Sequence, residues 1–150
     1  MDPVFERFVS SLENKFQELI SSEPMQINET PKDPGIYLFS ENDIHLYVGR
    51  TKNLRRRRKY HININALDAP FAFRLAREDT GNKKATYSKV GSRKDLLSNS
   101  VFLNSYKSAM NRIDKMDYRC VVESDPVKQA LLEIYVSIVL KSPHNDFDTH

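Results

Sequence analysis

Two tyrosines and a run of arginines lie close together in the first half of the sequence. Tyr37 ends the segment Gly-Ile-Tyr, Tyr47 begins Tyr-Val-Gly, and four consecutive arginines follow at positions 55–58. Nearby positive charge lowers the pKa of a tyrosine from its usual value of about 10, which lets the hydroxyl exchange a proton. A guanidinium offers a fixed fork of donors that matches phosphate oxygens. This combination of residues indicates chemistry on a phosphodiester.

Arg57 and His61 are four residues apart in a segment that we expect to be helical. Side chains at this spacing lie on one face of a helix, where both can address the same anionic group. Histidine exchanges a proton near neutral pH and can polarise a water molecule. Taken singly, each residue is better explained without chemistry: Arg57 as solvent-exposed, His61 as packed, and the strand tyrosines as half-buried.

Glu133 differs from its surroundings because it lies within the otherwise apolar segment 130–136. A buried carboxylate needs a partner, since an unpaired charge away from water is costly. The sequence leaves two partners open: a cationic side chain, or a divalent cation such as Mg²⁺, which takes oxygen ligands and keeps several waters. Asn145 follows Pro143 and can either hydrogen-bond the same site or cap the C-terminal tail.

The pattern of apolar and helix-breaking residues predicts the elements that position these side chains. Helical spacing of apolar residues predicts a helix over 3–20, and prolines predict an extended connector over 21–34. The elements expected after it are strands over 36–39 and 45–48 with a turn at 41–43, a helix from the cap Asn53 to about 64, a helix from Pro70, a basic loop over 79–95, a helix over 95–116, a strand over 118–123 and a helix from 126 to about 140. This order favours a small mixed sheet covered by helices.

Length and composition set the class of protein. With 150 residues, 39% apolar and 29% charged, the chain is expected to form one soluble domain with a compact core. No apolar run approaches the roughly 20 residues that span a membrane, and the N-terminus lacks the layout of a signal peptide. The single cysteine, Cys120, is expected to fill the core and suits a reducing compartment. We therefore expect a cytoplasmic protein without a membrane partner.

The net charge of +3 conceals an uneven distribution. Residues 50–94 hold 14 lysines and arginines against three acidic residues, so this segment carries +11 and the remaining chain −8. Such a split indicates a basic face for a polyanion on an otherwise acidic body, although a solvated basic helix has the same composition. Charge alone does not separate DNA from RNA or from a lipid surface.

Six residues or short motifs resemble, in order and spacing, the signature of the GIY-YIG endonucleases. They are Gly35-Ile36-Tyr37, Tyr47-Val48-Gly49, Arg57, His61, Glu133 and Asn145, with Val48 where the family name has isoleucine. The resemblance implies an α+β (mixed α/β) fold with a small three-stranded antiparallel sheet flanked by helices. We expect a single domain over 1–150, with the catalytic core over about 34–146. Residues 1–30 would add an N-terminal helix and connector.

The resemblance also implies that the protein is an enzyme, a metal-dependent DNA endonuclease that leaves 5′-phosphate and 3′-hydroxyl ends. Tyr37 would be the general base for the attacking water, directly or with help from His61, and Tyr47 would orient the water or the phosphate. Arg57 would stabilise charge on the non-bridging oxygens, a preorganised interaction worth several kcal/mol. We choose Arg57 over its neighbours because it lies ten residues after Tyr47 and four before His61.

By the same resemblance, Glu133 would hold one Mg²⁺ or Mn²⁺ near the leaving oxygen, and Asn145 would support that site. A role in DNA repair or recombination and a restriction-like role in defence both agree with the sequence, in a monomer or a homodimer. The alternative is a catalytically silent nucleic-acid-binding module on the same scaffold, in which Tyr37 and Glu133 would be dispensable.

The remaining cations of the basic segment are expected to bind DNA, with RNA left open. Contacts to phosphate position a protein without reading base sequence, and they weaken steeply with salt. The residues expected to make them are Arg50, Lys52, Arg55, Arg56, Arg58, Lys59, Lys83, Lys84, Lys89, Arg93 and Lys94.

Overall fold

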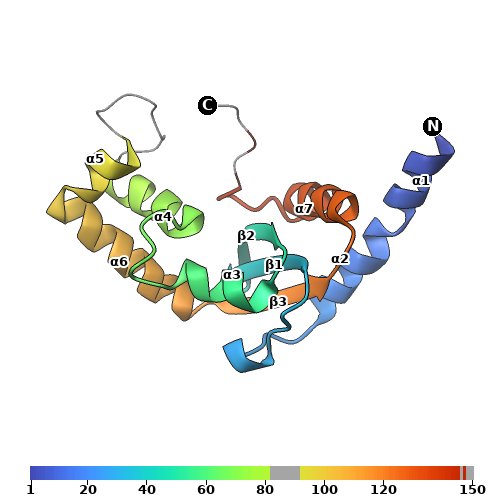
Figure 1. Ribbon diagram of the computed structural model, residues 1–150, viewed down its shortest axis with the longest axis horizontal. Coiled ribbons are helices and arrows are strands. Elements are labelled where there is room, and N and C mark those ends of the chain that lie inside the picture. Colours follow the sequence, from blue (N-terminus) through green and yellow to red (C-terminus); the bar gives the residue numbers. More distant parts are fainter. Residues whose placement is uncertain (82–91, 146, 148–150) are drawn as a thin grey trace. The chain divides into compact units, whose positions relative to one another are not determined.

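The computed structural model describes residues 1–81, 92–145 and 147. The chain forms two compact units, one made of Met1–Arg58 with Met116–Asn145 and the other containing Lys59–Lys115. The first unit contains the sheet, and the described residues of the second form helices and their connections (Figure 1). In the described part of the chain, none of the helices combines the length and apolar character that a membrane span requires. A single domain over 1–150 stays a prediction.

A sheet with the strand order β2-β1-β3 forms the centre of the first unit. β1 (Gly35–Glu41) pairs antiparallel with β2 (Ile44–Thr51) on one side and with β3 (Asp117–Val122) on the other. Asn42 and Asp43 join β1 to β2 with positive φ angles of 52° and 63°. Tight hairpin turns require this conformation, and asparagine and aspartate tolerate it better than most residues. The expected three-stranded antiparallel sheet and the α+β fold are confirmed.

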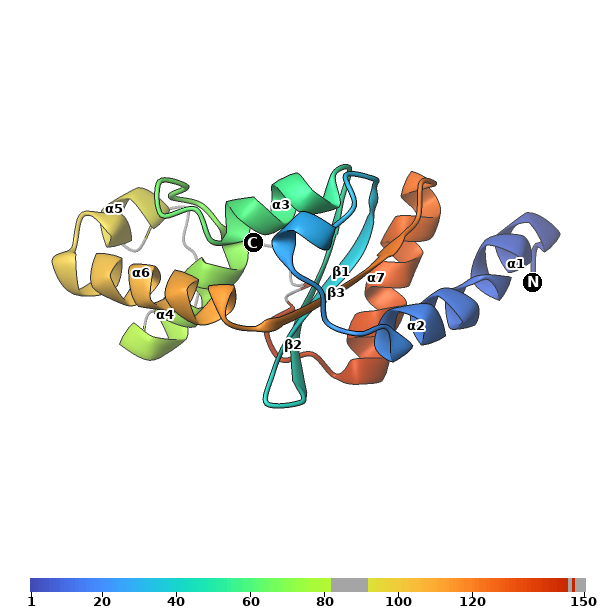
Figure 2. The same ribbon diagram turned by 90° about the horizontal axis from the view of Figure 1, so that it is seen from below.

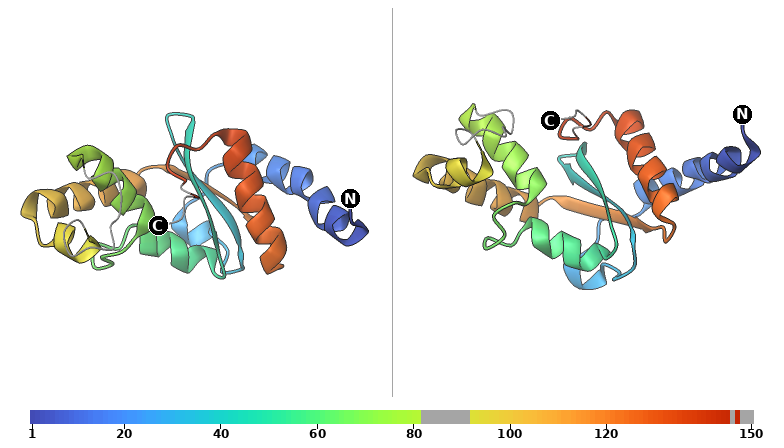
Figure 3. Two further views of the ribbon diagram at one scale, coloured as in Figure 1. Left: turned by 90° about the horizontal axis from the view of Figure 1, so that it is seen from above. Right: turned by 45° about the horizontal axis from the view of Figure 1, so that its top comes forward.

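An apolar core covers one face of this sheet. Because side chains alternate along a strand, Ile36 and Leu38 point to the same face, where α2 (Leu12–Ser21) and α7 (Pro126–Leu140) pack. The buried members of the core are Leu12, Phe16, Leu19, Ile36, Leu38, Val48, Val121, Leu132 and Val136. Figure 2 and Figure 3 show α7 running alongside the strands. Tyr37 and Phe39 occupy the alternate positions of β1 and therefore point to the opposite face.

The single helix expected over 3–20 is divided in two. α1 (Pro3–Ser10) is capped by Asp2 and buries no residue, whereas α2 buries Leu12, Phe16 and Leu19. The division falls at Ser11, whose hydroxyl donates to the carbonyl oxygen of Phe8 (3.1 Å). Such local bonds from serine compete with the bonds that continue a helix. The extra N-terminal helix is therefore present as two consecutive helices.

The connector between α2 and β1 covers the outer edge of β3. An edge strand exposes backbone groups that lack partners in the sheet. Here the N–H of Met25 donates to the carbonyl oxygen of Tyr118 (3.0 Å), and Nε of Arg119 donates to the carbonyl oxygen of Ser22 (2.9 Å). The connector also contains a short 3₁₀ helix, η1 (Ile27–Glu29), where the sequence predicts extended chain. The N-terminal extension thus completes the sheet edge.

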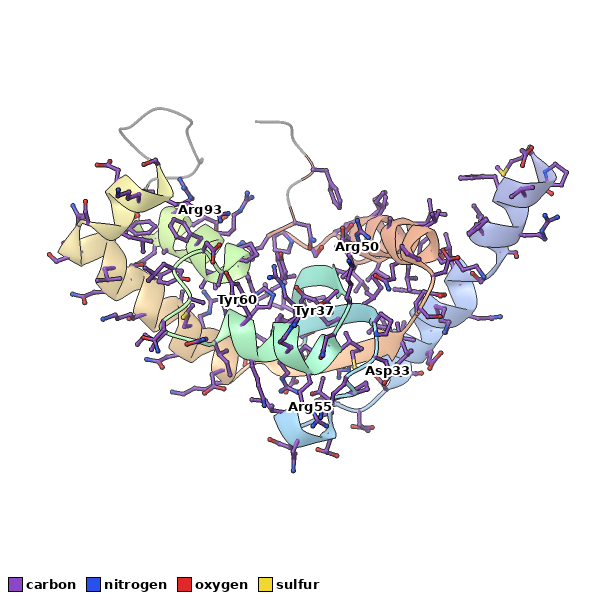
Figure 4. The ribbon with its side chains drawn as sticks, in the orientation of Figure 1. Asp33, Tyr37, Arg50, Arg55, Tyr60 and Arg93 are labelled. Carbon is purple, nitrogen blue, oxygen red and sulfur yellow. The ribbon has the colours of Figure 1, made fainter. Side chains whose placement is uncertain are left out.

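Two arginines of α3 (Leu54–His61) hold this connector. Arg55 donates to the carbonyl oxygens of Thr30 (2.7 Å) and Asn28 (2.9 Å). Arg58 is 8% exposed and donates to the carbonyl oxygen of Met25 (2.8 Å) and to Oγ1 of Thr30 (2.9 Å). Figure 4 shows Arg55 close to the connector. Both guanidiniums therefore have structural partners inside the first unit.

Helices begin where the sequence places their caps. Asn53 caps α3 by accepting from the N–H of Arg56 (3.0 Å), Pro70 is the first residue of α4 (Pro70–Thr80), and Asp125 caps α7. α3 ends at His61, a few residues before the predicted limit. Caps and prolines act locally, so a sequence pattern is sufficient to find them.

The second unit differs from the prediction after α4. The helix expected over 95–116 is divided into α5 (Arg93–Leu97) and α6 (Ser100–Asp114), because Asn99 accepts from two N–H groups and starts a new helix. α4 and α6 pack through Phe73, which contacts Phe102 and Tyr106 with ring centroids 5.3 and 5.2 Å apart. Much of the loop expected over 79–95 lies outside the described residues.

The role of Arg58 as an anchor predicts a stability effect. Arg58→Ala should lower the free energy of unfolding by about 2–3 kcal/mol, since two hydrogen bonds from a charged donor are lost, one to the buried Thr30 and one to the partly buried Met25. Urea denaturation followed by circular dichroism measures this change. Arg56→Ala, two residues earlier and exposed, is the matched control and should stay within about 0.5 kcal/mol of the wild type. Equal losses in both variants would contradict the assignment.

Candidate active site

The hairpin places both tyrosines on one face of the sheet. Tyr37 pairs with Gly49, and Tyr47 pairs with Phe39, so the two tyrosines are diagonal neighbours on adjacent strands. Their ring centroids are 6.4 Å apart. Tyr37 is buried, with 1% of its surface exposed, whereas Tyr47 is partly exposed. The two phenols thus lie at different depths of one site.

The two motif glycines allow close approaches that no side chain would permit. A Cβ atom on Gly49 would lie 2.2 Å from both Cζ and Oη of Tyr37, so the end of the phenol ring occupies the space above this residue. A Cβ atom on Gly35 would lie 2.2 Å from the carbonyl oxygen of Val121 on β3. Glycine at position 49 therefore makes room for the tyrosine itself, and glycine at position 35 lets β3 pair closely with β1.

The hydroxyl of Tyr37 is held in its protonated form. Burial raises its pKa well above the usual value, and nearby Tyr47 raises it further. Arg57 acts in the opposite direction, through its charge and through a hydrogen bond that it donates to Tyr37. The negative charge of Glu133 also raises the pKa of Tyr37. Tyr37, Tyr47, Arg57 and Glu133 are therefore electrostatically connected.

The four arginines of α3 have different partners. Arg57 is directed to Tyr37, while Arg58 faces the interior and holds the connector. Arg55 is also bonded to the connector, and Arg56 is exposed. Arg57 is thus the arginine in contact with the buried tyrosine, in the register chosen from the sequence. Its catalytic role stays a prediction.

Glu133 lies at the outer edge of β2. Its carboxylate accepts a hydrogen bond from the backbone N–H of Arg50. Burial raises the pKa of Glu133, and the charge and hydrogen bond of Arg50 oppose this shift. Figure 4 shows Arg50 beside α7, the helix that carries Glu133. The carboxylate is therefore partly desolvated and already uses an edge N–H as a partner.

Asn145 pairs with the backbone of β2 in the manner of an extra strand. Its Oδ1 accepts from the N–H of Val48 (3.0 Å), and its Nδ2 donates to the carbonyl oxygen of Val48 (2.7 Å). Ser142 donates to the same Oδ1 (2.6 Å), and the N–H of His144 donates to the carbonyl oxygen of Leu46 (3.2 Å). The amide of Asn145 thus holds Val48, the residue between Tyr47 and Gly49. The sequence alone does not reveal that Asn145 acts through the backbone of β2.

The other predicted residues vary in exposure. His61 is fully buried on the last turn of α3, four residues after Arg57. The exposed residues of the predicted DNA-binding set are Arg50, Lys52, Arg56, Lys59, Arg93 and Lys94. Lys83, Lys84 and Lys89 lie outside the described residues. DNA contacts by any of these side chains stay predictions.

Sequence reasoning overlooked Tyr118. This residue of β3 stacks on Tyr37, with ring centroids 6.0 Å apart and an interplanar angle of 15°. Its strand position was predicted, but the register that places it beside Tyr37 depends on pairing between residues distant in sequence. Alternation of apolar residues gives no signal for such a contact.

A divalent cation fits the donor set around Glu133. Among the described residues, no three side chains of histidine, cysteine, aspartate or glutamate form a cluster that would enclose a metal ion. Hard cations often need one or two carboxylates, because waters and substrate phosphate oxygens complete their coordination. The Glu133 carboxylate accepts one backbone N–H and keeps further lone pairs, so it can serve as such a single ligand.

No protein-family model matches the sequence, and no curated protein matches it. Three solved structures are similar to the chain, all of the GIY-YIG N-terminal endonuclease domain of UvrC from Thermotoga maritima, as point mutants bound to the catalytic divalent cation. The match covers 80% of this chain and 90–91% of theirs, with 14–15% sequence identity and a TM-score of 0.44. The chain is similar in fold to GIY-YIG endonuclease domains. The function proposed below rests on the residues of the site itself.

The contact between Gly49 and Tyr37 predicts a coupled effect on stability and activity. Gly49→Ala should destabilise the fold by about 1–3 kcal/mol, because the new methyl group overlaps the phenol ring and something must move. It should also abolish any cleavage activity that needs Tyr37 in place. Thermal unfolding and a plasmid cleavage assay measure the two effects.

Gly81→Ala is the matched control for this substitution. Gly81 has a φ of 80° and open space around it, so alanine there costs about 1 kcal/mol through backbone strain without touching Tyr37. The control should lose stability and keep activity. If Gly49→Ala behaves in the same way, the close approach has no functional consequence.

Proposed function

We propose that this protein is a metal-dependent endonuclease that hydrolyses DNA phosphodiesters to 5′-phosphate and 3′-hydroxyl ends. The supporting observation is the group formed by Tyr37, Tyr47, Arg57 and Glu133 in the first unit. Arg57 is bonded to the buried tyrosine, Tyr47 lies beside it, and the charge of Glu133 influences its pKa. Two phenols, a permanent cation and a carboxylate supply the chemical groups that phosphodiester hydrolysis needs.

In the proposed reaction, Arg57 binds the scissile phosphate. A guanidinium has five donors, so one side chain can bond both Tyr37 and a non-bridging phosphate oxygen. Charge accumulates on these oxygens in the transition state, and a preorganised cation stabilises it more than it stabilises the ground state. The hydrogen bond to Tyr37 orients the guanidinium of Arg57 before the substrate binds.

In this proposal Tyr37 first gives up its own proton, directly or with help from His61, and the resulting phenolate accepts the proton of the attacking water. Burial raises the pKa of Tyr37, so additional positive charge in its surroundings is needed before the phenolate forms. Tyr47 is partly exposed and orients the water or the phosphate. Asn145 keeps this part of β2 in place through Val48.

Glu133 would hold one Mg²⁺ or Mn²⁺. The cation would supply charge that lowers the pKa of neighbouring phenols and stabilises the leaving 3′-oxygen. The N–H of Arg50 fixes the orientation of the carboxylate, as an outer partner does for many metal ligands.

The exposed cations of the basic segment would hold the DNA backbone. Arg50, Lys52, Arg56 and Lys59 follow Tyr47 in the sequence, and all four are exposed. Contacts of this kind do not read base sequence, so they suit a repair or recombination nuclease, whereas a restriction-like nuclease would also need an element that reads bases. Either would act as a monomer or a homodimer. The buried free thiol of Cys120 agrees with a cytoplasmic location.

A catalytically silent nucleic-acid-binding module is the second candidate. It is favoured by one observation, the deep burial of Tyr37 and the protonated state that follows. Such a module would keep the exposed cations in use and would not need Glu133. Incubation with plasmid, branched and single-stranded DNA in Mg²⁺, Mn²⁺ or EDTA separates the two candidates.

Removal of the proposed metal ligand should abolish cleavage. Glu133→Gln should lower kcat by about 100-fold or more, because the charge stabilisation supplied by a bound cation is worth several kcal/mol. Mn²⁺ titration followed by electron paramagnetic resonance should show weaker binding in the same variant. Glu18→Gln removes the same charge from the exposed side of α2 and should alter neither measurement. An undiminished kcat in Glu133→Gln, or full cleavage in EDTA, would refute metal dependence through this residue.

The division of the arginine run predicts different kinetic effects for neighbouring residues. Arg57→Ala should lower kcat by about 10²–10³-fold, the range found when one donor to a developing charge is removed. Arg56→Ala should instead raise KM and make the salt dependence of binding shallower by about one charge, since an exposed phosphate contact is lost. Steady-state cleavage at several salt concentrations distinguishes the two variants. If Arg57→Ala and Arg56→Ala lose kcat equally, Arg57 is not the arginine that stabilises the phosphate in the transition state.

A further inference from the structure

Tyr118 forms the aromatic contact on the ring face of Tyr37. It lies on β3 opposite Phe39, while Tyr37 lies opposite Cys120, so the two tyrosines are diagonal cross-strand neighbours. Their rings are nearly parallel, with centroids 6.0 Å apart and an interplanar angle of 15°. Long aromatic side chains reach such diagonal neighbours, and these pairs stabilise a sheet. Tyr118 therefore limits the movement of the Tyr37 ring.

Tyr118 is itself held firmly. The guanidinium of Arg58 lies 4.1 Å from its ring centroid, and Phe39 meets it edge to face at 5.3 Å. Arg58 is in turn bonded to Met25 and Thr30 of the connector. A cation at this distance from an aromatic ring is attracted to it, and the attraction is larger when both groups are buried. The ring of Tyr118 thus connects Tyr37 to an anchored part of the first unit.

The aromatic ring of Tyr118 makes these interactions, and its hydroxyl takes no part in them. Tyr118 is 0% exposed, and its Oη has no hydrogen-bond partner among the described residues. A buried hydroxyl without a partner is unfavourable for stability. Phenylalanine would preserve the stack on Tyr37 and remove this unfavourable group.

We propose that Tyr118, braced by Arg58, is a positioning residue that fixes the ring of Tyr37 against Gly49 for the reaction. The proposal rests on the proposed nuclease function for its kinetic consequence. Tyr37 is confined on one side by the backbone of Gly49 and on a ring face by Tyr118. Displacement of a reacting group by about 1 Å can lower a rate about 100-fold, so a loose Tyr37 would be a poor base.

The test compares an aromatic replacement with a flexible one of similar volume. Tyr118→Phe should keep kcat within about threefold of the wild type and should raise the midpoint of thermal unfolding, since the stack stays and the unpartnered hydroxyl is removed. Tyr118→Met should lower kcat by about 10- to 100-fold with KM little changed. Phe16→Met is the control, because Phe16 packs on the opposite face of the sheet and its loss should reduce stability without reducing kcat.

Two outcomes would overturn the proposal. If Tyr118→Met keeps its kcat, the stack does not position Tyr37. If Tyr118→Phe loses as much activity as Tyr118→Met, the hydroxyl matters and the ring contact does not.

An NMR measurement tests the same contact and depends neither on cleavage activity nor on the folding of Tyr118→Met. The ring protons of Tyr37 in the wild type and in Tyr118→Phe should be shifted by the neighbouring ring and should exchange slowly between ring-flip states. Averaged, unshifted signals would overturn the positioning role. If the wild type cuts no DNA at all, the proposed function fails, and these ring signals alone decide whether Tyr118 orders Tyr37.

Discussion

Coverage of the two sheet edges is the constraint on which the rest of this molecule depends. A three-stranded sheet has two edge strands, and each exposes backbone groups that need partners. At β2 the partners are the amide of Asn145, the N–H of His144 and the carboxylate of Glu133. At β3 the partner is the connector around Met25. Two of these residues, Glu133 and Asn145, are also among the site residues predicted from the sequence, so the predicted site lies on side chains that close the edge of β2.

The same constraint explains why the arginine run of α3 has to be divided. The connector that covers β3 must be held in place, and Arg55 and Arg58 provide its anchors. Arg57 lies between them in sequence but points to the phenol site, because consecutive helical residues project in different directions. Two of its four arginines, Arg55 and Arg58, therefore contribute to the fold.

The burial of Tyr37 links packing to chemistry. Close packing of its ring against Gly49 and Tyr118 orders the phenol, and the same burial raises its pKa. A group that is ordered but protonated is a base only after its electrostatic surroundings change. Arg57 already acts in that direction, and a cation held by Glu133 would act in the same way. Burial of Tyr37 thus accounts both for the order of the phenol and for the condition that its proposed role as a base would require.

The sequence by itself determined the local features of this protein. Strands around the two tyrosines, the cap at Asn53 and the helix starts at Pro70 and Pro126 depend on neighbouring residues, and the structure has them where the pattern places them. The breaks at Ser11 and Asn99 were missed because side-chain bonds to nearby backbone overrode the apolar periodicity. Only the tertiary structure decided that Arg55 and Arg58 hold the connector, that Asn145 pairs with Val48 and that Tyr118 stacks beside Tyr37. These contacts join residues far apart in sequence, and strand register and side-chain direction, which set them, leave no trace in local residue patterns.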